Sequence, residues 1–289
     1  MVVIKKAGGQ DCELLARINE DENPDFLCHV YTSWQQQGGL FLAEREGELV
    51  GFCGLTFPAP TEAQILGIRL LPEYQKEAIG REFVIALIQE AQQAGCNIVR
   101  MLTSTENYET QAALQRNLNF ERRGTWVVGY REKLVLPETG ITPLPPFGPH
   151  DLEEVWQFLQ YSLTYRHSEG LLFKPEYTYR SFSKAHLGRL MEKGQVYGAY
   201  EGDMLAGVAV AQICDDVLVI RYIDARMPVV PELLQGLLAG KDVSLLTSAV
   251  PTSGYRDIKP VLERMLEKHQ PDHWLVMEKE VSPLAMPRD

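Results

Sequence analysis

Apolar and polar residues alternate over short stretches of the N-terminal half, and a helical repeat separates two of these stretches. Alternation is typical of half-buried strands, whereas apolar residues spaced by about four indicate a helix. Positions 79, 83, 87 and 91 are apolar, and Gly95 follows as a helix stop, so a helix is predicted over 78–94. The predicted order is strand 2–6, helices 10–20 and 25–36, strands 39–45, 48–57 and 63–71, helix 78–94, strand 97–103, helix 109–117 and strand 125–135.

This order predicts an α+β fold. The strands of 39–57 form a hairpin around Glu46-Gly47-Glu48, and the helix of 78–94 crosses between two further strands. Antiparallel strands followed by a strand–helix–strand crossover give a mostly antiparallel mixed sheet flanked by helices.

The chain repeats several of its patterns in the same order. "GGLFLAEREGELVGFCG" matches "GQVYGAYEGDMLAGVAV", "ILGIRLL" matches "VLVIRYI", and "WVVGYREKL" matches "WLVMEKEV". The proline- and glycine-rich segment 136–150 separates the two sets and is the best linker candidate. We therefore expect two tandem domains of one fold, at 1–137 and 138–289. Within the second, "YSLTYRHSEGLLFKPEYTYRSF" is interpreted as a helix and a loop.

Composition and charge exclude several classes of partner and site. The 289 residues carry a formal net charge of −11, which argues against nucleic acid and anionic membranes as partners. No apolar stretch is long enough to span a bilayer, and five scattered cysteines without a CxxC pattern suggest reduced thiols. A cytoplasmic protein is expected. His269 and His273 have the spacing of paired zinc ligands, but Pro271 lies between them and no third ligand is near, so no metal is expected.

The stretch "LLPEYQKEAIGRE" carries the candidate chemistry. It joins an apolar strand to the start of the predicted helix, and its small residues Ala78 and Gly80 lie at that start. Free amides at a helix N-terminus attract anions, and small residues let a bulky phosphate approach the backbone. An ordinary strand-to-helix turn that binds nothing is the alternative. The stretch fits neither a Walker loop nor a dinucleotide fingerprint.

The same residues resemble the GNAT superfamily of acyl-CoA-dependent N-acetyltransferases. "LLPEYQKEAIG" is similar to the family's Q/R-x-x-G-x-G/A turn with its proline- and tyrosine-containing lead, and "MLTSTENYETQAALQRNLNF" resembles the strand, Asn-containing loop and short helix downstream. The resemblance covers about residues 1–135 and is much weaker over the second copy, where "YIDARMPVVPELLQGLL" lacks the turn. It implies two tandem GNAT-like domains, the second one degenerate.

The resemblance also implies the cosubstrate and its contacts. Acetyl-CoA would lie between strands 63–71 and 97–103, with its pantetheine arm on the strand backbone and near an Asn, and its pyrophosphate on the turn. The implied contact residues are Ile68, Leu70, Gln75, Lys76, Glu77, Ala78, Ile79, Gly80, Arg81 and Asn107. Here Ala78 stands where the family has its middle glycine, and Glu77 places a carboxylate beside the phosphate site.

Catalytic groups are harder to place by this resemblance. Gln115 stands where the family often has a tyrosine acid, and Gln64 where part of it has a glutamate base. Glu62, on the same strand face, and Tyr108 are the replacement candidates. Two hypotheses stay open: an N-acetyltransferase acting on a small amine, and a non-catalytic acyl-CoA-binding or regulatory protein of the same fold.

The acidic segment "INEDENPDF" and the net charge favour a cationic amine as the acceptor. A solvated loop is the alternative interpretation of that segment. The sequence leaves open whether the protein is a monomer or a homodimer.

Overall fold

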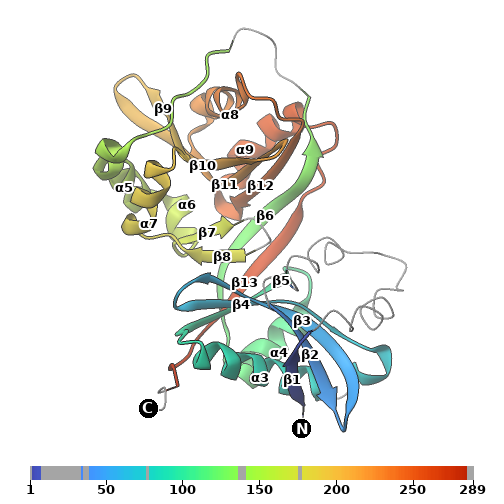
Figure 1. Ribbon diagram of the computed structural model, residues 1–289. Helices are drawn as coiled ribbons and strands as arrows, with labels where there is room; N and C mark the ends of the chain where they lie inside the picture. The colour runs from blue at the N-terminus through green and yellow to red at the C-terminus, as the bar shows by residue number, and fades with distance from the viewer. Residues whose placement is uncertain are drawn as a thin grey trace. The chain divides into compact units, whose positions relative to one another are not determined.

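The computed structural model describes residues 2–7, 34, 39–75, 78–135, 141–174 and 178–284. The described chain divides into two compact units (Figure 1). The first contains residues up to Thr103, Asn107–Arg122 and Met277 onward; the second contains Ser104–Glu106 and Arg123–Val276. The helices predicted at 10–20 and 25–36 and the acidic segment 18–26 lie outside the described residues, apart from Trp34.

The first unit is built on one mixed sheet. Its strands are β1 (Val3–Lys6), β2 (Leu40–Arg45), β3 (Glu48–Ala59), β4 (Glu62–Leu70) and β5 (Ile98–Ser104), in that spatial order. The pairs β1–β2, β2–β3 and β3–β4 are antiparallel, and β4–β5 is parallel. This confirms the mostly antiparallel sheet that the alternating pattern predicts.

The crossover between β4 and β5 is α3 (Ile79–Gln93), which follows the short 3-10 helix η2 (Pro72–Tyr74). The apolar positions that predict this helix, Ile79, Phe83, Leu87 and Ala91, are all buried. A second helix, α4 (Tyr108–Leu118), follows β5, and both helices lie on the same side of the sheet (Figure 1). α4 ends at Asn119, whose left-handed backbone (φ 55°) forms the helix stop.

From its hairpin onward, the second unit repeats the order of elements found in the first. Its hairpin consists of β9 (Val196–Glu201) and β10 (Met204–Cys214), followed by β11 (Val217–Ala225), the 3-10 helix η4 (Met227–Val229) and α8 (Val230–Leu238). β12 (Leu245–Pro251) and α9 (Thr252–Met265) come next. β10–β11 is antiparallel and β11–β12 parallel, as for β3–β4–β5.

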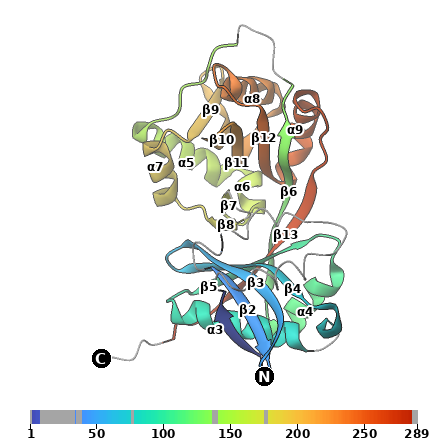
Figure 2. The ribbon, with the colours of Figure 1, turned by 45° about the vertical axis from the view of Figure 1, so that its right-hand side comes forward.

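Further elements cover this second sheet. Before β9 the chain forms four helical elements: η3 (Pro149–Asp151), α5 (Leu152–Tyr161), α6 (Leu163–His167) and α7 (Lys184–Glu192). A hairpin of β7 (Leu171–Lys174) and β8 (Thr178–Ser181) lies between α6 and α7 in the sequence. α5 and α7 lie on one side of the sheet, and α8 and α9 lie on the other (Figure 2). The interpretation of 161–182 as a helix and a loop is therefore wrong in part, because the segment contains a β-hairpin.

Two glycines occupy matching positions in the two sheets. Gly51 lies opposite Leu70, the last residue of β4, and Gly207 lies opposite Ala225, the last residue of β11. A Cβ on Gly51 would come within 2.3 Å of the Arg69 carbonyl oxygen, and one on Gly207 within 2.8 Å of the Ala225 Cβ. Close strand approach therefore requires glycine at both positions.

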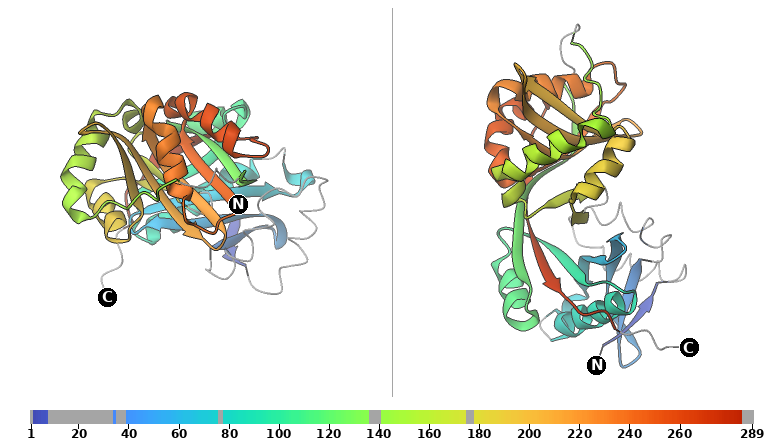
Figure 3. Two further views of the ribbon diagram at one scale, coloured as in Figure 1. Left: turned by 90° about the horizontal axis from the view of Figure 1, so that it is seen from above. Right: turned by 90° about the vertical axis from the view of Figure 1, so that its left-hand side faces the viewer.

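Each of the two remaining strands, β6 and β13, begins in one unit and continues in the other. β6 (Glu121–Lys133) pairs with β12, and from Arg123 it belongs to the second unit. β13 (Asp272–Glu280) is the neighbour of β5 in the strand order, and from Met277 it belongs to the first unit. In Figure 3, β6 is the long green strand and β13 the long red strand. Each unit is thus completed by a strand that follows the other unit's crossover in sequence.

Candidate functional site

The parallel strands β4 and β5 separate partway along their length. Their pairing runs from Glu62↔Ile98 to Ile65↔Met101, although β4 continues to Leu70. The β3–β4 register shifts between Phe52 and Gly54, and Gly67 in the facing stretch has a left-handed φ of 55°. A bulge of this kind bends a strand away from its neighbour. Ile68 and Leu70 therefore lie on the part of β4 that has left β5.

The turn after β4 is held by hydrogen bonds at its base. The Leu71 amide donates to the Val50 carbonyl at 3.0 Å, and Pro72 opens η2. The Tyr74 hydroxyl donates to Glu48 Oε2 at 3.0 Å, which ties the turn to the β2–β3 hairpin. The Gln75 side-chain amide donates to the Leu70 carbonyl at 3.2 Å. This contact uses a backbone acceptor at the end of β4.

The start of α3 keeps its first amides available. Ala78 is the N-cap residue and has no side-chain acceptor, and the first helical hydrogen bond runs from the Glu82 amide to the Ala78 carbonyl at 3.1 Å. The amides of residues 79–81 precede that bond, so they point out of the helix start. A Cβ on Gly80 would meet only the Leu70 side chain, at 3.6 Å. The protein's own packing therefore does not require glycine at position 80.

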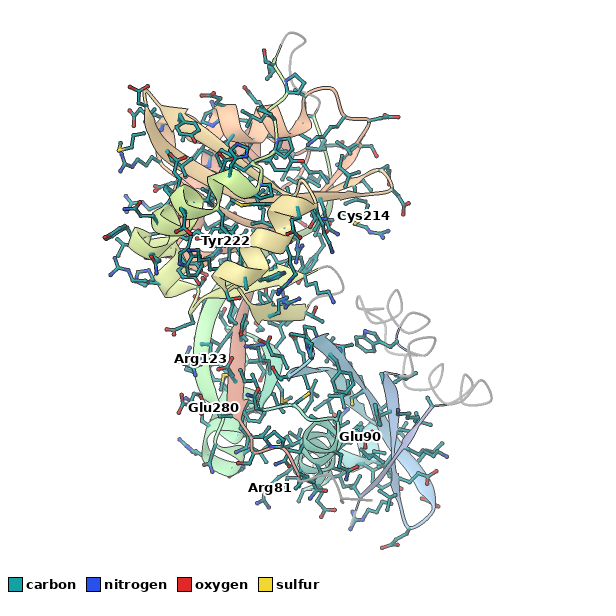
Figure 4. The ribbon with its side chains drawn as sticks, turned by 60° about the vertical axis from the view of Figure 1, so that its left-hand side comes forward. Arg81, Glu90, Arg123, Cys214, Tyr222 and Glu280 are labelled. Atoms are coloured by element: carbon teal, nitrogen blue, oxygen red, sulfur yellow. The ribbon has the colours of Figure 1, made fainter. Side chains whose placement is uncertain are left out.

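Side chains around this helix start are mixed in character. Arg81 is exposed in the first turn of α3, while Glu90 lies further along the same helix (Figure 4). Ile79 points into the core, so only its backbone can face a ligand. The Glu82 carboxylate accepts from the Val2 amide at 2.8 Å. Lys76 and Glu77 lie outside the described residues.

Asn107 and Tyr108 begin the second helix of the unit. The Asn107 side-chain oxygen accepts from the Thr110 amide at 3.1 Å and caps α4. Its carboxamide nitrogen points away from that bond, which leaves a donor for a ligand. Tyr108 is the first residue of α4 and is 73% exposed. Its hydroxyl is therefore accessible to a substrate from solvent.

Glu62 belongs to a buried ion cluster that the sequence did not reveal. Arg100, on β5 and 1% exposed, donates from Nη1 to Glu62 Oε2 at 2.6 Å and from Nε to Glu278 Oε2 at 2.7 Å. Glu278 comes from β13, so the cluster joins three strands of the first unit. The available signal was a single arginine inside the apolar run "NIVRMLTS". A buried arginine needs carboxylate partners, which here come from 38 and 178 residues away.

Two classes of site are not found in the described part of the chain. No group of three His, Cys, Asp or Glu side chains there could hold a metal ion. No helix among these residues is both long and apolar enough to cross a membrane.

Comparisons with known proteins bear on this geometry. Residues 12–120 match the acetyltransferase (GNAT) family. A segment of 89 residues is 30% identical to mycothiol acetyltransferase of Sanguibacter keddieii; it spans 29% of this chain and 28% of that relative. The matched segment is thus a small part of that protein.

Solved structures extend the likeness to nearly the whole chain. A GCN5-related N-acetyltransferase from Sphaerobacter thermophilus superposes with a TM-score of 0.55 at 14% identity, covering 96% of this chain and 95% of that one. A proposed acetyltransferase from Thermoplasma acidophilum gives 0.53 at 12% identity, covering 96% and 91%. At these identities the likeness concerns the fold. Residues 12–120 thus match the acetyltransferase (GNAT) family, and almost the whole chain shares its fold with solved structures described as acetyltransferases.

Proposed function

We propose that the first unit binds acetyl-CoA and transfers its acetyl group to a small amine. The observation that carries this proposal is the separation of β4 from β5 next to an α3 start with open amides. A thioester cosubstrate has a narrow arm that fits between parting strands and a pyrophosphate that suits a helix N-terminus. The family match over 12–120 supports the same reaction class.

The chain's own groups would divide the work between the two ends of the site. The β4 backbone at Ile68 and Leu70 would bind the pantetheine arm, and the amides of residues 78–81 would bind the pyrophosphate. Because Gln75 already donates to the Leu70 carbonyl, it would have to release that oxygen or share it with the ligand. Arg81, and Lys76 by the sequence alone, would add positive charge, while the Asn107 carboxamide would reach the arm. Acetyl-CoA supplies the activated acyl carbon.

Acyl transfer also needs proton movement. A neutral amine attacks the thioester carbonyl, the C–S bond breaks, the amine proton goes to a base, and the leaving thiolate takes a proton from an acid. We propose Glu62 as the base and Tyr108 as the acid. Glu62 would act while held by Arg100 at 2.6 Å, on the paired part of β4 that precedes the separation from β5. Tyr108 is accessible enough to donate its hydroxyl proton.

A second candidate function is acyl-CoA binding without catalysis. The observation that favours it is the same ion pair: Glu62 has a buried arginine as its partner at 2.6 Å, so a free base at this position is lost. The two functions differ in a simple assay. A binder retains acetyl-CoA unchanged in the presence of any amine, whereas an enzyme releases CoA.

We also propose that the chain contains two tandem copies of one fold, at 1–137 and 138–289, of which the second is degenerate. In the folded units, β6 from Arg123 belongs to the second unit and β13 from Met277 belongs to the first. The shared order of elements and the matched Gly51 and Gly207 support a duplication. In the first unit, residues 75–78 separate η2 from α3; in the second, η4 ends at Val229 and α8 begins at Val230. Without those four residues, and with Pro231 at the start of α8, the second copy lacks the turn that would hold a pyrophosphate.

The acceptor is proposed to be a small cationic amine, because the chain's net charge of −11 favours cations over anionic polymers. Nucleic acid and membranes are not expected partners. A monomer or a homodimer in the cytoplasm fits this proposal.

Calorimetry with acetyl-CoA tests the site. Gly80→Phe should weaken binding at least about tenfold, since a bulky side chain blocks the approach to the first α3 amides. Gly80→Ala is the matched control, because its methyl group meets only Leu70 at 3.6 Å. Equal affinity in wild type and Gly80→Phe would show that the pyrophosphate binds elsewhere. Chromatographic detection of CoA release with an amine panel then separates the enzyme from the binder.

A further inference from the structure

Arg221 is placed by an irregularity in the sheet of the second unit. The β10–β11 register passes from Ala211↔Ile220 to Val210↔Tyr222, so Arg221 is the extra residue of a bulge. Bulges re-aim side chains, and here consecutive residues no longer alternate strictly between the two faces. Val219 and Arg221 lie outside the apolar core formed with α8 and α9, to which Ile220 and Ile223 belong.

The Arg221 guanidinium is buried among neutral partners. It is 5% exposed; its Nε donates to the Phe173 carbonyl at 3.0 Å, and its Nη1 lies 3.4 Å from both Gln195 Oε1 and Gln212 Oε1. Among the described residues, no carboxylate pairs with it. Arg100, the buried arginine of the first unit, has two carboxylates at 2.6 and 2.7 Å. Carboxylate partners such as those of Arg100 are what a buried guanidinium normally requires.

A second arginine, Arg180, acts electrostatically on Arg221. Burial, and then the like charge of Arg180 on β8, lower the pKa of Arg221 to about 10. Burial, Arg180 and Arg221 likewise lower the pKa of His186 to about 4. Arg221 stays charged at neutral pH. Burying a charge without a counter-charge costs several kcal/mol, so the site gains from a negatively charged ligand.

Arg221 itself is buried, but several of its neighbours are partly exposed. Arg180, Gln195, Gln212 and Cys214 are all half-buried. Cys214 is a free thiol to which the Gln212 amide donates at 3.1 Å. It ends β10, while Tyr222 lies on β11 next to Arg221 (Figure 4). A small ion can therefore approach from the side of these partly exposed residues.

We propose that Arg221 binds a small oxyanion, either a carboxylate or a phosphate. Two oxygens on one atom match the planar donor fork of a guanidinium. The long 3.4 Å contacts to Gln195 and Gln212 would give way to the stronger charged pair. The site consists of residues of the second unit, and the inference does not depend on the acyl transfer proposed for the first.

One internal competitor must be tested directly. The β7–β8 connection at 175–177 lies outside the described residues and contains Glu176. If its carboxylate neutralised Arg221, wild type would bind no added anion and Glu176→Gln would create or strengthen the binding. That result would overturn the proposal.

Calorimetry on the full chain provides the main test, with sodium phosphate or sodium acetate added at constant ionic strength. Wild type should bind at least one of them, and the tighter one identifies the ligand class. Arg221→Gln should weaken binding about tenfold or more, as loss of a charged hydrogen bond predicts. Arg226→Gln is the matched control, since Arg226 is exposed and its Glu201 contact is 4.0 Å long. No binding by wild type, or equal binding by wild type and Arg221→Gln, would refute the site.

A second readout uses Cys214 in the wild-type protein and does not depend on a folded variant. Peptide mapping after alkylation gives the rate at this thiol for negatively charged iodoacetate and for neutral iodoacetamide. An open positive site should favour iodoacetate, and saturating phosphate or acetate should remove that preference. If the rate ratio at Cys214 does not change with either anion, no anion occupies the site.

Discussion

Replacing Arg100 with Met should destabilise the first unit more than most single substitutions. The guanidinium is buried and holds the Glu62 and Glu278 carboxylates at 2.6 and 2.7 Å, and those two side chains are themselves 8% and 9% exposed. The variant removes the cation that these two buried carboxylates share. Breaking a buried pair by removing one partner costs about 3–5 kcal/mol, and here one residue serves two pairs, so we expect the upper part of that range.

The assay must distinguish the two units. Hydrogen exchange of the β5 amides at 98–103 reports the first unit, and exchange of the β12 amides at 245–250 reports the second. In the variant, the free energy of opening measured at the β5 amides should be several kcal/mol lower than in wild type. The decrease measured at the β12 amides should be smaller. Replacing all three residues with apolar ones, Glu62→Leu, Arg100→Met and Glu278→Leu, should recover much of the loss, since no charge then remains buried. A loss below about 1 kcal/mol in Arg100→Met, or an equal loss in both strands, would refute the reasoning.

Three further predictions concern other parts of the chain. Burial and the charges of Arg180, Arg221 and Arg189 lower the pKa of His186 to about 4, so between about pH 4 and 6.5 this side chain stays neutral in the folded state but takes up a proton in the unfolded chain. The free energy of unfolding should therefore be highest above about pH 6.5 and fall by up to about 3 kcal/mol toward pH 4. Urea titrations at several pH values should show a weaker pH dependence for His186→Gln than for wild type. Gly51→Ala should lower the melting temperature by several degrees in calorimetric scans, because its Cβ would meet a backbone oxygen at 2.3 Å; unchanged melting would contradict the close strand approach. Turnover of a cationic amine should decrease between low and 0.1 M salt, where screening shortens electrostatic attraction to about 10 Å, and an acceptor panel in which only peptides react would exclude a small amine.

Local patterns predicted the elements well where one physical preference dominated. The spacing of Ile79, Phe83, Leu87 and Ala91 placed α3 to within a residue at each end, because a buried helix face must repeat in this way. The β2–β3 turn was also evident, and both Glu46 (φ 55°) and Gly47 (φ 87°) adopt the left-handed backbone that a tight hairpin needs.

Strand partners could not be predicted in the same way. β6 and β13 have similar apolar patterns, "WVVGYREKL" and "WLVMEKEV", so either could complete either sheet. Their arrangement depends on tertiary contacts such as Arg100 with Glu278, which are 178 residues apart. The β7–β8 hairpin escaped prediction because Lys174 and Thr178 enclose a short connection that contains proline, in a stretch without clear alternation. The candidate sites could not be predicted fully for the same reason. The bulges at Gly67 and Arg221 arise from strand pairing, which the local sequence does not show.

The position of β13 has a consequence for the order in which the protein can mature on the ribosome. The first unit includes residues from Met277 onward, so its sheet and its Arg100 ion cluster cannot be completed until β13 has been synthesised. At about 5–20 residues per second, the 154 residues from Arg123 to Val276 take roughly 8–30 s to translate. During that interval β5 has an unpaired edge and a buried arginine without one of its carboxylates. A nascent chain of this kind exposes the features that chaperones bind, and a strand synthesised after the whole of the second unit closes the domain that was begun first.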